Sequence, residues 1–156
     1  MFEAFFLKPY KKIHSYCKSH GVEFVVHHSY SYCANLLPTM IEMGIDVWQG
    51  CMTSNNIPAL IAKYGGRMTF MGDIANKAVD FEGCTQADCE KAALHTIKHC
   101  ASTKYYIPCI TQGGPGSLYA GTYAGLWDAI DAYNCKTFGF TKEQLEELRP
   151  HMTVMF

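Results

Sequence analysis

Residues 23–50, EFVVHHSYSYCANLLPTMIEMGIDVWQG, decide the fold of this chain. An apolar run ends in two histidines, a small polar loop follows, and a helical pattern then leads into a second apolar run that ends at Trp48. This order predicts a strand–loop–helix–strand unit with ligand-type side chains at the carboxyl end of its first strand. In parallel α/β proteins, binding and catalytic groups gather at that end of the strands.

The same alternation of apolar runs and helical patterns continues along the chain. Continuous apolar runs rich in β-branched or aromatic residues predict strands over 22–27, 45–48, 68–71 and 105–110. Apolar residues at helical spacing predict helices over 3–19, 35–43, 56–63, 85–101, 117–133 and 143–149. In the first of these helices, the residues expected to face the core are Phe6, Ile13 and Cys17.

Local signals mark several helix ends. Gly21 follows the first helix, where a left-handed residue favours glycine. Thr85 with Asp88, and Thr141 with Gln144, have the spacing of capping boxes. These signals support the helix boundaries that the apolar pattern predicts.

Each predicted strand precedes a helix, and the strands recur at intervals of about 20 to 40 residues. This pattern calls for right-handed parallel βαβ units. Four such units make about half of a (β/α)8 barrel, of the kind named after triosephosphate isomerase (TIM), and a whole barrel needs ~250 residues. An open doubly wound sheet would also use the length of 156 residues. With 49% hydrophobic residues and no linker, the chain is expected to form a single domain over residues 1–156.

Composition narrows the class of protein. The formal charge of -1, from 13 basic and 14 acidic residues, argues against nucleic-acid binding. No apolar run approaches the ~20 residues that span a membrane, and the first residues lack the features of a signal peptide. The eight cysteines are scattered along the chain, as is typical of reduced thiols. We therefore expect a cytoplasmic protein that does not enter a membrane.

Several segments, taken in order, resemble one known family. They are HSYSY at 28–32, LPTMIEMGID at 37–46, YGGRMTFMGDI at 64–74 and YIPC at 106–109. This ordered set resembles the carboxyl-terminal half of the uroporphyrinogen decarboxylase-like superfamily, which includes cobalamin-dependent methyltransferases. The similarity extends from about Phe5 to Tyr133. It implies a TIM-barrel-like fold, represented by a half-barrel.

The resemblance also implies a metal site. The methyltransferases hold zinc through a His-x-Cys pair and a distant Cys, so that a bound thiol loses its proton and attacks a methyl–cobalt bond. Here His28 has the histidine position, Tyr30 stands at the paired cysteine, and Cys109 lies near the distant ligand. The implied zinc site is His28 with Cys109, aided by His27 or Cys33. The alternative is that the histidines bind loop carbonyls and the cysteines pack in the core.

Other candidate site residues lie at strand ends and in one loop. Asp73 is a candidate catalytic carboxylate, or else a loop-capping residue. The candidates for substrate binding are Trp48, Gln49, Gly113 and Gly114. Trp48 has the alternative of a core residue. The two glycines lie in a loop that either presents N–H groups to an anion before the helix expected from Ser117, or forms a plain tight turn.

Three functions remain open from the sequence. The leading one is methyl transfer to or from a cobalamin protein, with methylcobalamin carried by a partner corrinoid protein. The second is decarboxylation of a carboxylated tetrapyrrole or small acid, and the third is a non-catalytic binding or assembly module. Because a lone half-barrel leaves a sheet edge uncovered, we expect a second copy of the chain or a separately encoded amino-terminal half as a partner.

Overall fold

The structure, a computed structural model, describes residues 1–100, 104–113 and 116–149. Its centre is a four-stranded sheet in which neighbouring strands run parallel, in the order β1-β2-β3-β4. The strands are β1 (Val26–His28), β2 (Val47–Cys51), β3 (Thr69–Ile74) and β4 (Tyr106–Ile110). The prediction of an α/β fold with four parallel strands is confirmed.

Helices connect and flank these strands. They are α1 (Lys8–Ser19), α2 (Leu37–Glu42), α3 (Ile57–Tyr64), α4 (Gln86–Cys100), α5 (Thr122–Phe138) and α6 (Lys142–Leu148). Short turns of helix precede several of them: the π-turn η1 (Glu3–Leu7) and the 3-10 turns η2 (Ala34–Leu36), η3 (Thr53–Asn55) and η4 (Asn76–Ala78). Helices α1, α2 and α3 each have proline at one of the first two positions, where its fixed φ suits the helical backbone.

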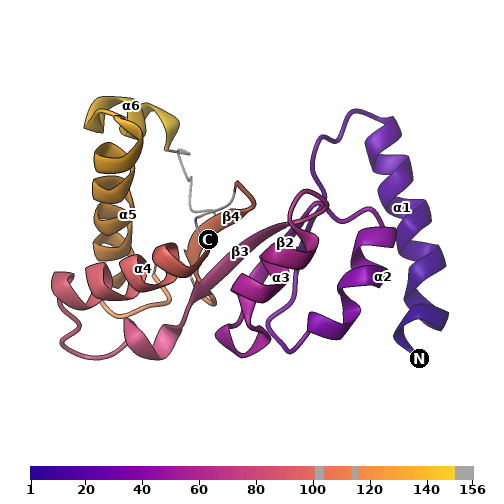
Figure 1. Cartoon of the computed structure of the whole chain (residues 1–156), viewed down its shortest axis with the longest axis horizontal. Coiled ribbons are helices and arrows are strands. Elements are labelled where there is room, and N and C mark those ends of the chain that lie inside the picture. Colours follow the sequence, from indigo (N-terminus) through magenta and orange to yellow (C-terminus); the bar gives the residue numbers. More distant parts are fainter. Residues whose placement is uncertain (101–103, 114–115, 150–156) are drawn as a thin grey trace.

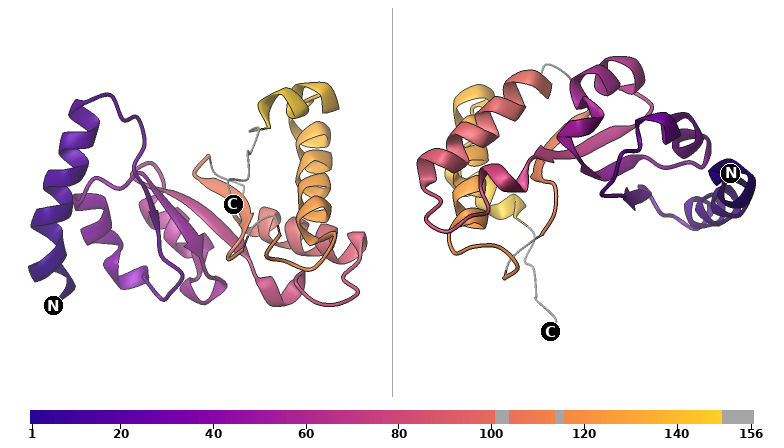
Figure 2. Two further views of the ribbon diagram at one scale, coloured as in Figure 1. Left: turned by 180° about the vertical axis from the view of Figure 1, so that it is seen from behind. Right: turned by 90° about the horizontal axis from the view of Figure 1, so that it is seen from below.

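The chain winds across the sheet in one direction. Helices α2, α3 and α4 lie together beside the sheet, α1 stands at one end of the molecule, and α5 with α6 stands at the other (Figure 1). Seen from behind, the central strands face the viewer with no helix drawn over them (Figure 2). A doubly wound sheet has a reversal in strand order and helices on both faces. The described strands follow one another in chain order, so this alternative does not fit.

The main core lies between the sheet and helices α2 to α4. Trp48 and Phe70 sit side by side on β2 and β3, fully buried, with their ring centroids 6.1 Å apart in an edge-on arrangement. Leu37, Ile57 and Cys100 bring one residue from each helix into the same cluster. Because one cluster joins three helices to two strands, these helices cover a single face of the sheet.

A second core joins α4 to α5 at the β4 end of the sheet. It contains Ile74, Ile110 and Leu126, from two strands and α5. Gly125 permits the close approach of the two helices, since a Cβ there would lie 2.9 Å from Cys89 Sγ on α4. Helix α5 therefore packs against α4 beside the last strand.

Helix α6 is fastened to α5 by one arginine. Arg149 pairs with Asp131 on α5 and, at 3.0 Å, with Glu146, while its guanidinium lies 4.9 Å from the ring centre of Trp127. Leu145 is the buried residue of α6. Charge, cation–π contact and one apolar side chain thus hold the end of the described chain.

Several predicted boundaries shift in the structure. Strand β1 begins at Val26, where pairing with Val47 starts, rather than at residue 22. Strands β2 and β3 extend beyond the predicted 48 and 71, to Cys51 and Ile74. The helix predicted over 117–133 occupies 122–138 instead, because left-handed Gly121 and Gly139 stand at its two ends. The end of the predicted 85–101 helix at residue 101 lies outside the described residues.

The expected core face of the first helix is wrong. The side chains of Phe6 and Ile13 are 43% and 55% exposed, and α1 contains no buried residue. The helix lies beyond α2 and contacts its end through His14, whose Nδ1 is 2.9 Å from the Met43 carbonyl. The apolar side of α1 therefore has no sheet to pack against, and the predicted residue Cys17 is half-buried.

The capping predictions are confirmed. Asp88 accepts from the Thr85 N–H at 3.0 Å, and the Thr85 hydroxyl accepts from the Asp88 N–H at 3.3 Å. Thr141 and Gln144 make the same reciprocal pair at α6. Gly21 adopts the left-handed conformation with φ 92°.

In the part of the chain that the structure describes, no helix has the length and apolarity to cross a membrane.

The contrast between buried and exposed apolar residues gives a stability prediction. We expect Phe70→Ala to lower the free energy of unfolding by about 3–5 kcal/mol, because a fully buried ring is replaced by a cavity. Ile13→Ala should change it by less than about 1 kcal/mol, since that side chain is already exposed. Urea unfolding followed by circular dichroism measures both. Equal losses for the two variants would show that α1 packs elsewhere than described.

Candidate functional site

Helices α2 to α4 leave one face of the sheet uncovered, and this is the open face, which α5 and α6 border only at its β4 end. Strand alternation and register place Val26, Val47 and Thr69 in one row across it, and His28, Gln49, Met71 and Ile107 in a second row nearer the carboxyl ends. Val26 and Ile107 are 57% and 42% exposed. The open face is thus apolar over much of its area, with a polar pair at one place.

That polar pair is His28 and Gln49. The His28 Nδ1 and the Gln49 Oε1 are hydrogen-bonded, and because an amide oxygen only accepts, Nδ1 carries the donated hydrogen. Gly50, with φ 89°, leaves room for the ring, since a Cβ there would lie 3.0 Å from His28 Cε1. With Nδ1 bonded to Gln49, Nε2 is the His28 nitrogen that remains to bind a ligand.

Trp48 lies on the opposite face from Gln49. It is fully buried, and its Nε1–H donates to the Ser29 carbonyl at 3.0 Å. Its position is that of a core side chain that holds the loop after β1. Of the two neighbours predicted to bind substrate, Gln49 therefore reaches the open face and Trp48 does not.

His27 and Cys33 are also separated from His28. His27 is half-buried beside α1 and α2, in a cavity of about 200 Å³ whose walls include Phe2 and Tyr10. Burial, followed by the nearby His14 and His28, lowers the pKa of His27. Cys33 is buried, with its Sγ 3.1 Å from the hydroxyls of Ser29 and Ser31. These contacts hold His27 beside α1 and α2, and they hold Cys33 within its own loop.

Asn55 is a residue that the sequence reasoning did not identify. It is 3% exposed, and its Oδ1 accepts from the backbone N–H groups of Cys33 and Ala34 at 2.8 and 3.1 Å. Its Nδ2 donates to the Ser31 carbonyl at 3.0 Å. Asn55 therefore fixes the loop that follows His28. The only sequence signal was its place in the polar run between β2 and the next helix.

Asp73 turns toward the helices rather than the open face. Gly72 has φ 142° and Asp73 φ 69°, so the regular alternation of β3 breaks there. Any Cβ at residue 72 would lie 2.7 Å from the Cys51 backbone nitrogen, which explains the glycine. The Asp73 carboxylate accepts from the Cys100 thiol at 3.5 Å.

Burial dominates the electrostatics around Asp73. It raises the pKa of the carboxyl group, while the Cys100 hydrogen bond and the charges of His95 and His99 act in the lowering direction. The pKa of the Cys100 thiol is raised to about 12 by burial and by Asp73. The group predicted to be catalytic is thus a buried acid on α4's side of the sheet.

Cys109 lies on β4, opposite Asp73 in the register. It is half-buried, and burial raises the pKa of its thiol. Strands β2 and β3 stand between it and His28. Within residues 1–100, 104–113 and 116–149, no three His, Cys, Asp or Glu side chains are grouped to hold a metal ion. Among the described residues, the implied ligands His28, Cys109, His27 and Cys33 are therefore not brought together around a zinc ion.

The glycine loop is described in part. Gly113 has φ 91°, and a Cβ there would lie 2.6 Å from Leu118 Cδ2, so the loop folds tightly on itself. Gly114 lies outside the described residues. Because α5 starts at Thr122, Gly113 does not stand at the start of a helix.

Comparison of the sequence with protein-family models and with curated proteins gives no match.

The buried acid gives a pH prediction. Because the folded state raises the pKa of Asp73, folding favours its protonated form, and ionisation penalises the folded state as pH rises above the ordinary 3.8. Asp73→Asn removes this penalty and keeps a residue that tolerates positive φ. Its free energy of unfolding, relative to the native chain, should increase from about pH 4 toward neutral pH, as measured by urea unfolding at several pH values.

Asp88→Asn is the matched control with the opposite sign. Hydrogen bonds from Thr85 lower the pKa of Asp88, so its charged form stabilises the folded state above pH 3.8. That variant should therefore lose most stability at neutral pH and least in acid. Parallel pH profiles for the two variants would contradict the buried-acid description of Asp73.

Proposed function

We propose that this chain is the carboxyl-terminal half of a (β/α)8 barrel of the uroporphyrinogen decarboxylase-like superfamily. We further propose that it takes part in methyl transfer to or from a corrinoid protein, together with a complementary half. The observation that carries the proposal is the open face, where exposed apolar residues and the His28–Gln49 pair lie on a sheet wound in one direction.

The sheet geometry supports the half-barrel. In a barrel, each strand pairs with the next in chain order, and the helices lie outside. The described strands have this order, with α2 to α4 on one face. The open face would then be the inner face, where Val26, Met71 and Ile107 would meet side chains of the other half. A parallel sheet with one uncovered face is rare in a complete protein.

The free edge of β4 could meet a complementary half mainly through side chains. The hydrogen bonds from Phe70 N to Tyr105 O and from Thr111 N to Ile74 O turn the backbone of alternate β4 residues toward β3. Pro108 therefore faces the free edge, where it lacks an N–H. Between this end of the open face and helices α5 and α6 is a groove of about 380 Å³, whose walls include Met71, Ile107 and Trp127. Contact at this edge would rely on side chains more than on a complete row of hydrogen bonds between strands.

The proposed chemistry assigns the open face to substrate. A thiolate acceptor attacks the methyl carbon of methylcobalamin, the S–CH3 bond forms, and the Co–CH3 electron pair stays on cobalt as cob(I)alamin. His28 and Gln49 lie at the carboxyl end of their strands, where they would bind and orient the acceptor. Zinc remains part of the proposal only through ligands that a complementary half would add to His28, and we derive no step from it.

Assembly is the first test. The proposal expects the purified full chain to form a dimer, or to bind a separately encoded half, as measured by sedimentation velocity. Val26→Glu places a charge on the open face and should weaken assembly by at least tenfold with little effect on folding, because Val26 is 57% exposed. Val22→Glu is the matched control, since Val22 is 44% exposed but precedes the sheet. A monomer that binds no partner and keeps an open face accessible to solvent would contradict the half-barrel.

Activity is the second test. The assembled protein is mixed with methylcobalamin and coenzyme M, and cob(I)alamin formation is followed by absorbance. His28→Ala should lower the rate by about 10²-fold or more if the pair orients the acceptor. Carbon dioxide release from uroporphyrinogen without methyl transfer would favour the decarboxylase instead. Stable assembly without either activity would favour the binding or assembly module.

A further inference from the structure

A cavity of about 410 Å³ with both polar and apolar walls lies on the other side of the sheet, beside the carboxyl end of β3. One wall is Thr53 in η3, and another is the segment from Asp73 to Ala78, which includes η4 and Lys77. The third wall is helix α4. The volume falls within the ~300–1,000 Å³ that small-molecule sites usually have.

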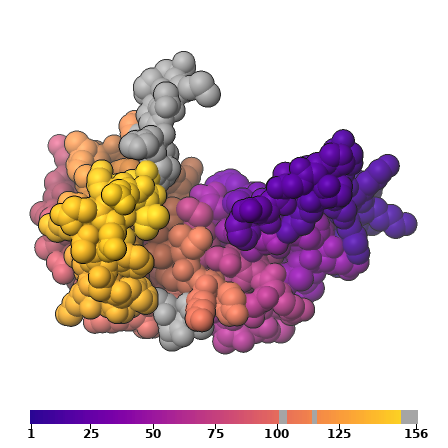
Figure 3. All heavy atoms as spheres, turned by 90° about the horizontal axis from the view of Figure 1, so that it is seen from above, coloured from indigo at the N-terminus to yellow at the C-terminus, as the bar shows by residue number. Residues whose placement is uncertain are grey.

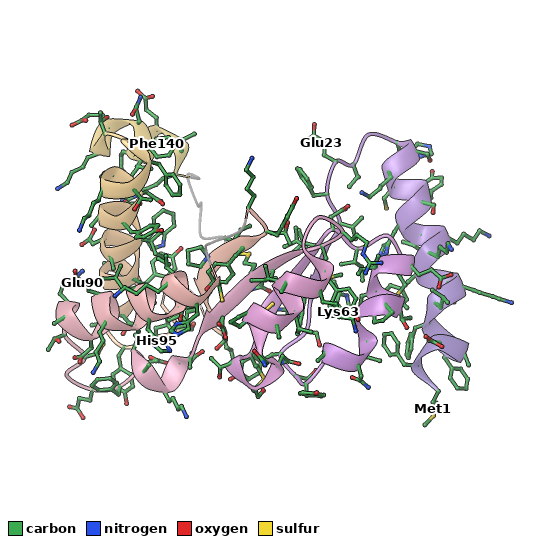
Figure 4. All side chains as sticks on the ribbon, viewed as in Figure 1. Met1, Glu23, Lys63, Glu90, His95 and Phe140 are labelled. Atoms are coloured by element: carbon green, nitrogen blue, oxygen red, sulfur yellow. The ribbon has the colours of Figure 1, made fainter. Side chains whose placement is uncertain are left out.

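One face of α4 supplies most of the polar lining. Asp88, Lys91 and His95 recur at spacings of three and four, so they share that face, and Thr96 follows His95 in the lining. The side chain of His95 lies on the side of α4 next to the turn after β3, whereas Glu90 lies on a different side of the helix (Figure 4). Side chains from α4 and from η4 therefore face one another across the cavity.

The charged side chains around the cavity differ in whether they have a partner of opposite charge or a hydrogen bond. Asp88 is held by the N–H and hydroxyl of Thr85, at 3.0 and 2.6 Å, in the capping box of α4. Among the described residues, Lys77 and Lys91 form no ion pair. Two ammonium groups and the His95 imidazole thus line a space whose own lining carboxylates are the helix cap Asp88 and the buried Asp73.

From this arrangement we propose that the cavity binds a small anionic molecule through its carboxylate or phosphate group. Lys77 and Lys91 bind the anionic group from opposite walls, and His95 and the Thr53 hydroxyl contribute hydrogen bonds. The site is independent of the proposed methyl transfer, because none of its lining residues lies on the open face.

The backbone and ionisation of Asp73 support a ligand at this place. Its positive φ of 69° is a strained conformation for a non-glycine residue, and such residues concentrate at functional sites. Burial raises the pKa of its carboxyl group, which favours the protonated form. A carboxyl group whose charged form is disfavoured repels an anion less than an ordinary carboxylate does.

The test is a titration of the full chain with two probes, inorganic phosphate and succinate, followed by amide chemical shifts in NMR. We expect saturable shifts confined to η3, η4 and α4. Lys91→Ala and Lys77→Ala should each weaken the dissociation constant for the preferred probe about tenfold. The probe that binds more tightly identifies the anionic group as phosphate or carboxylate.

Lys98→Ala is the matched control, because Lys98 is an exposed lysine on the same helix outside the cavity lining. It should leave both dissociation constants unchanged. Equal weakening by Lys98→Ala would show attraction to net charge and overturn the site. An absence of saturable shifts with both probes, in a chain whose spectrum shows it to be folded, would also overturn it.

Discussion

A parallel sheet needs cover on both faces, because its crossovers place helices over strands that are apolar throughout. Here the described helices α2 to α4 cover one face. Trp48 and Phe70 on that face are fully buried. The other face keeps Val26 and Ile107 open to solvent. Figure 3 shows α5 and α6 in yellow and the amino-terminal helix in indigo at the two ends, with other segments at the surface between them. Most features of the molecule follow from this one-sided cover.

The sequence predicted the elements better than their partners. Each strand was located because an apolar β-branched run carries its own signal, and the capping boxes of α4 and α6 were right because they depend on residues close in sequence. Phe6 and Ile13 were wrong for a different reason. Helical spacing shows which side of a helix is apolar, but only the neighbouring helix decides whether that side is covered.

The candidate site was predictable to the same degree. His28 and Gln49 were each predicted as site residues because they lie at the carboxyl ends of strands. In the structure, the register pairs them directly. Which face each side chain takes was not predictable at β3. Gly72 and Asp73 both adopt positive φ, and the alternation that would have placed Asp73 on the open face ends there. The hydrogen bonds of Asn55 join segments 22 residues apart, which no local pattern reports.

The break at Gly72 and Asp73 separates two kinds of chemistry on one sheet. On the open face, the imidazole of His28 is exposed and lies beside the apolar rows. On the helix face, the turn of β3 places the Asp73 carboxyl group under α4, beside the cavity that Lys77 and Lys91 line. Because the cavity walls come from η3, η4 and α4, covering the open face does not close it. The proposed ligand and the proposed partner would therefore contact opposite faces of the sheet, and neither would block the other.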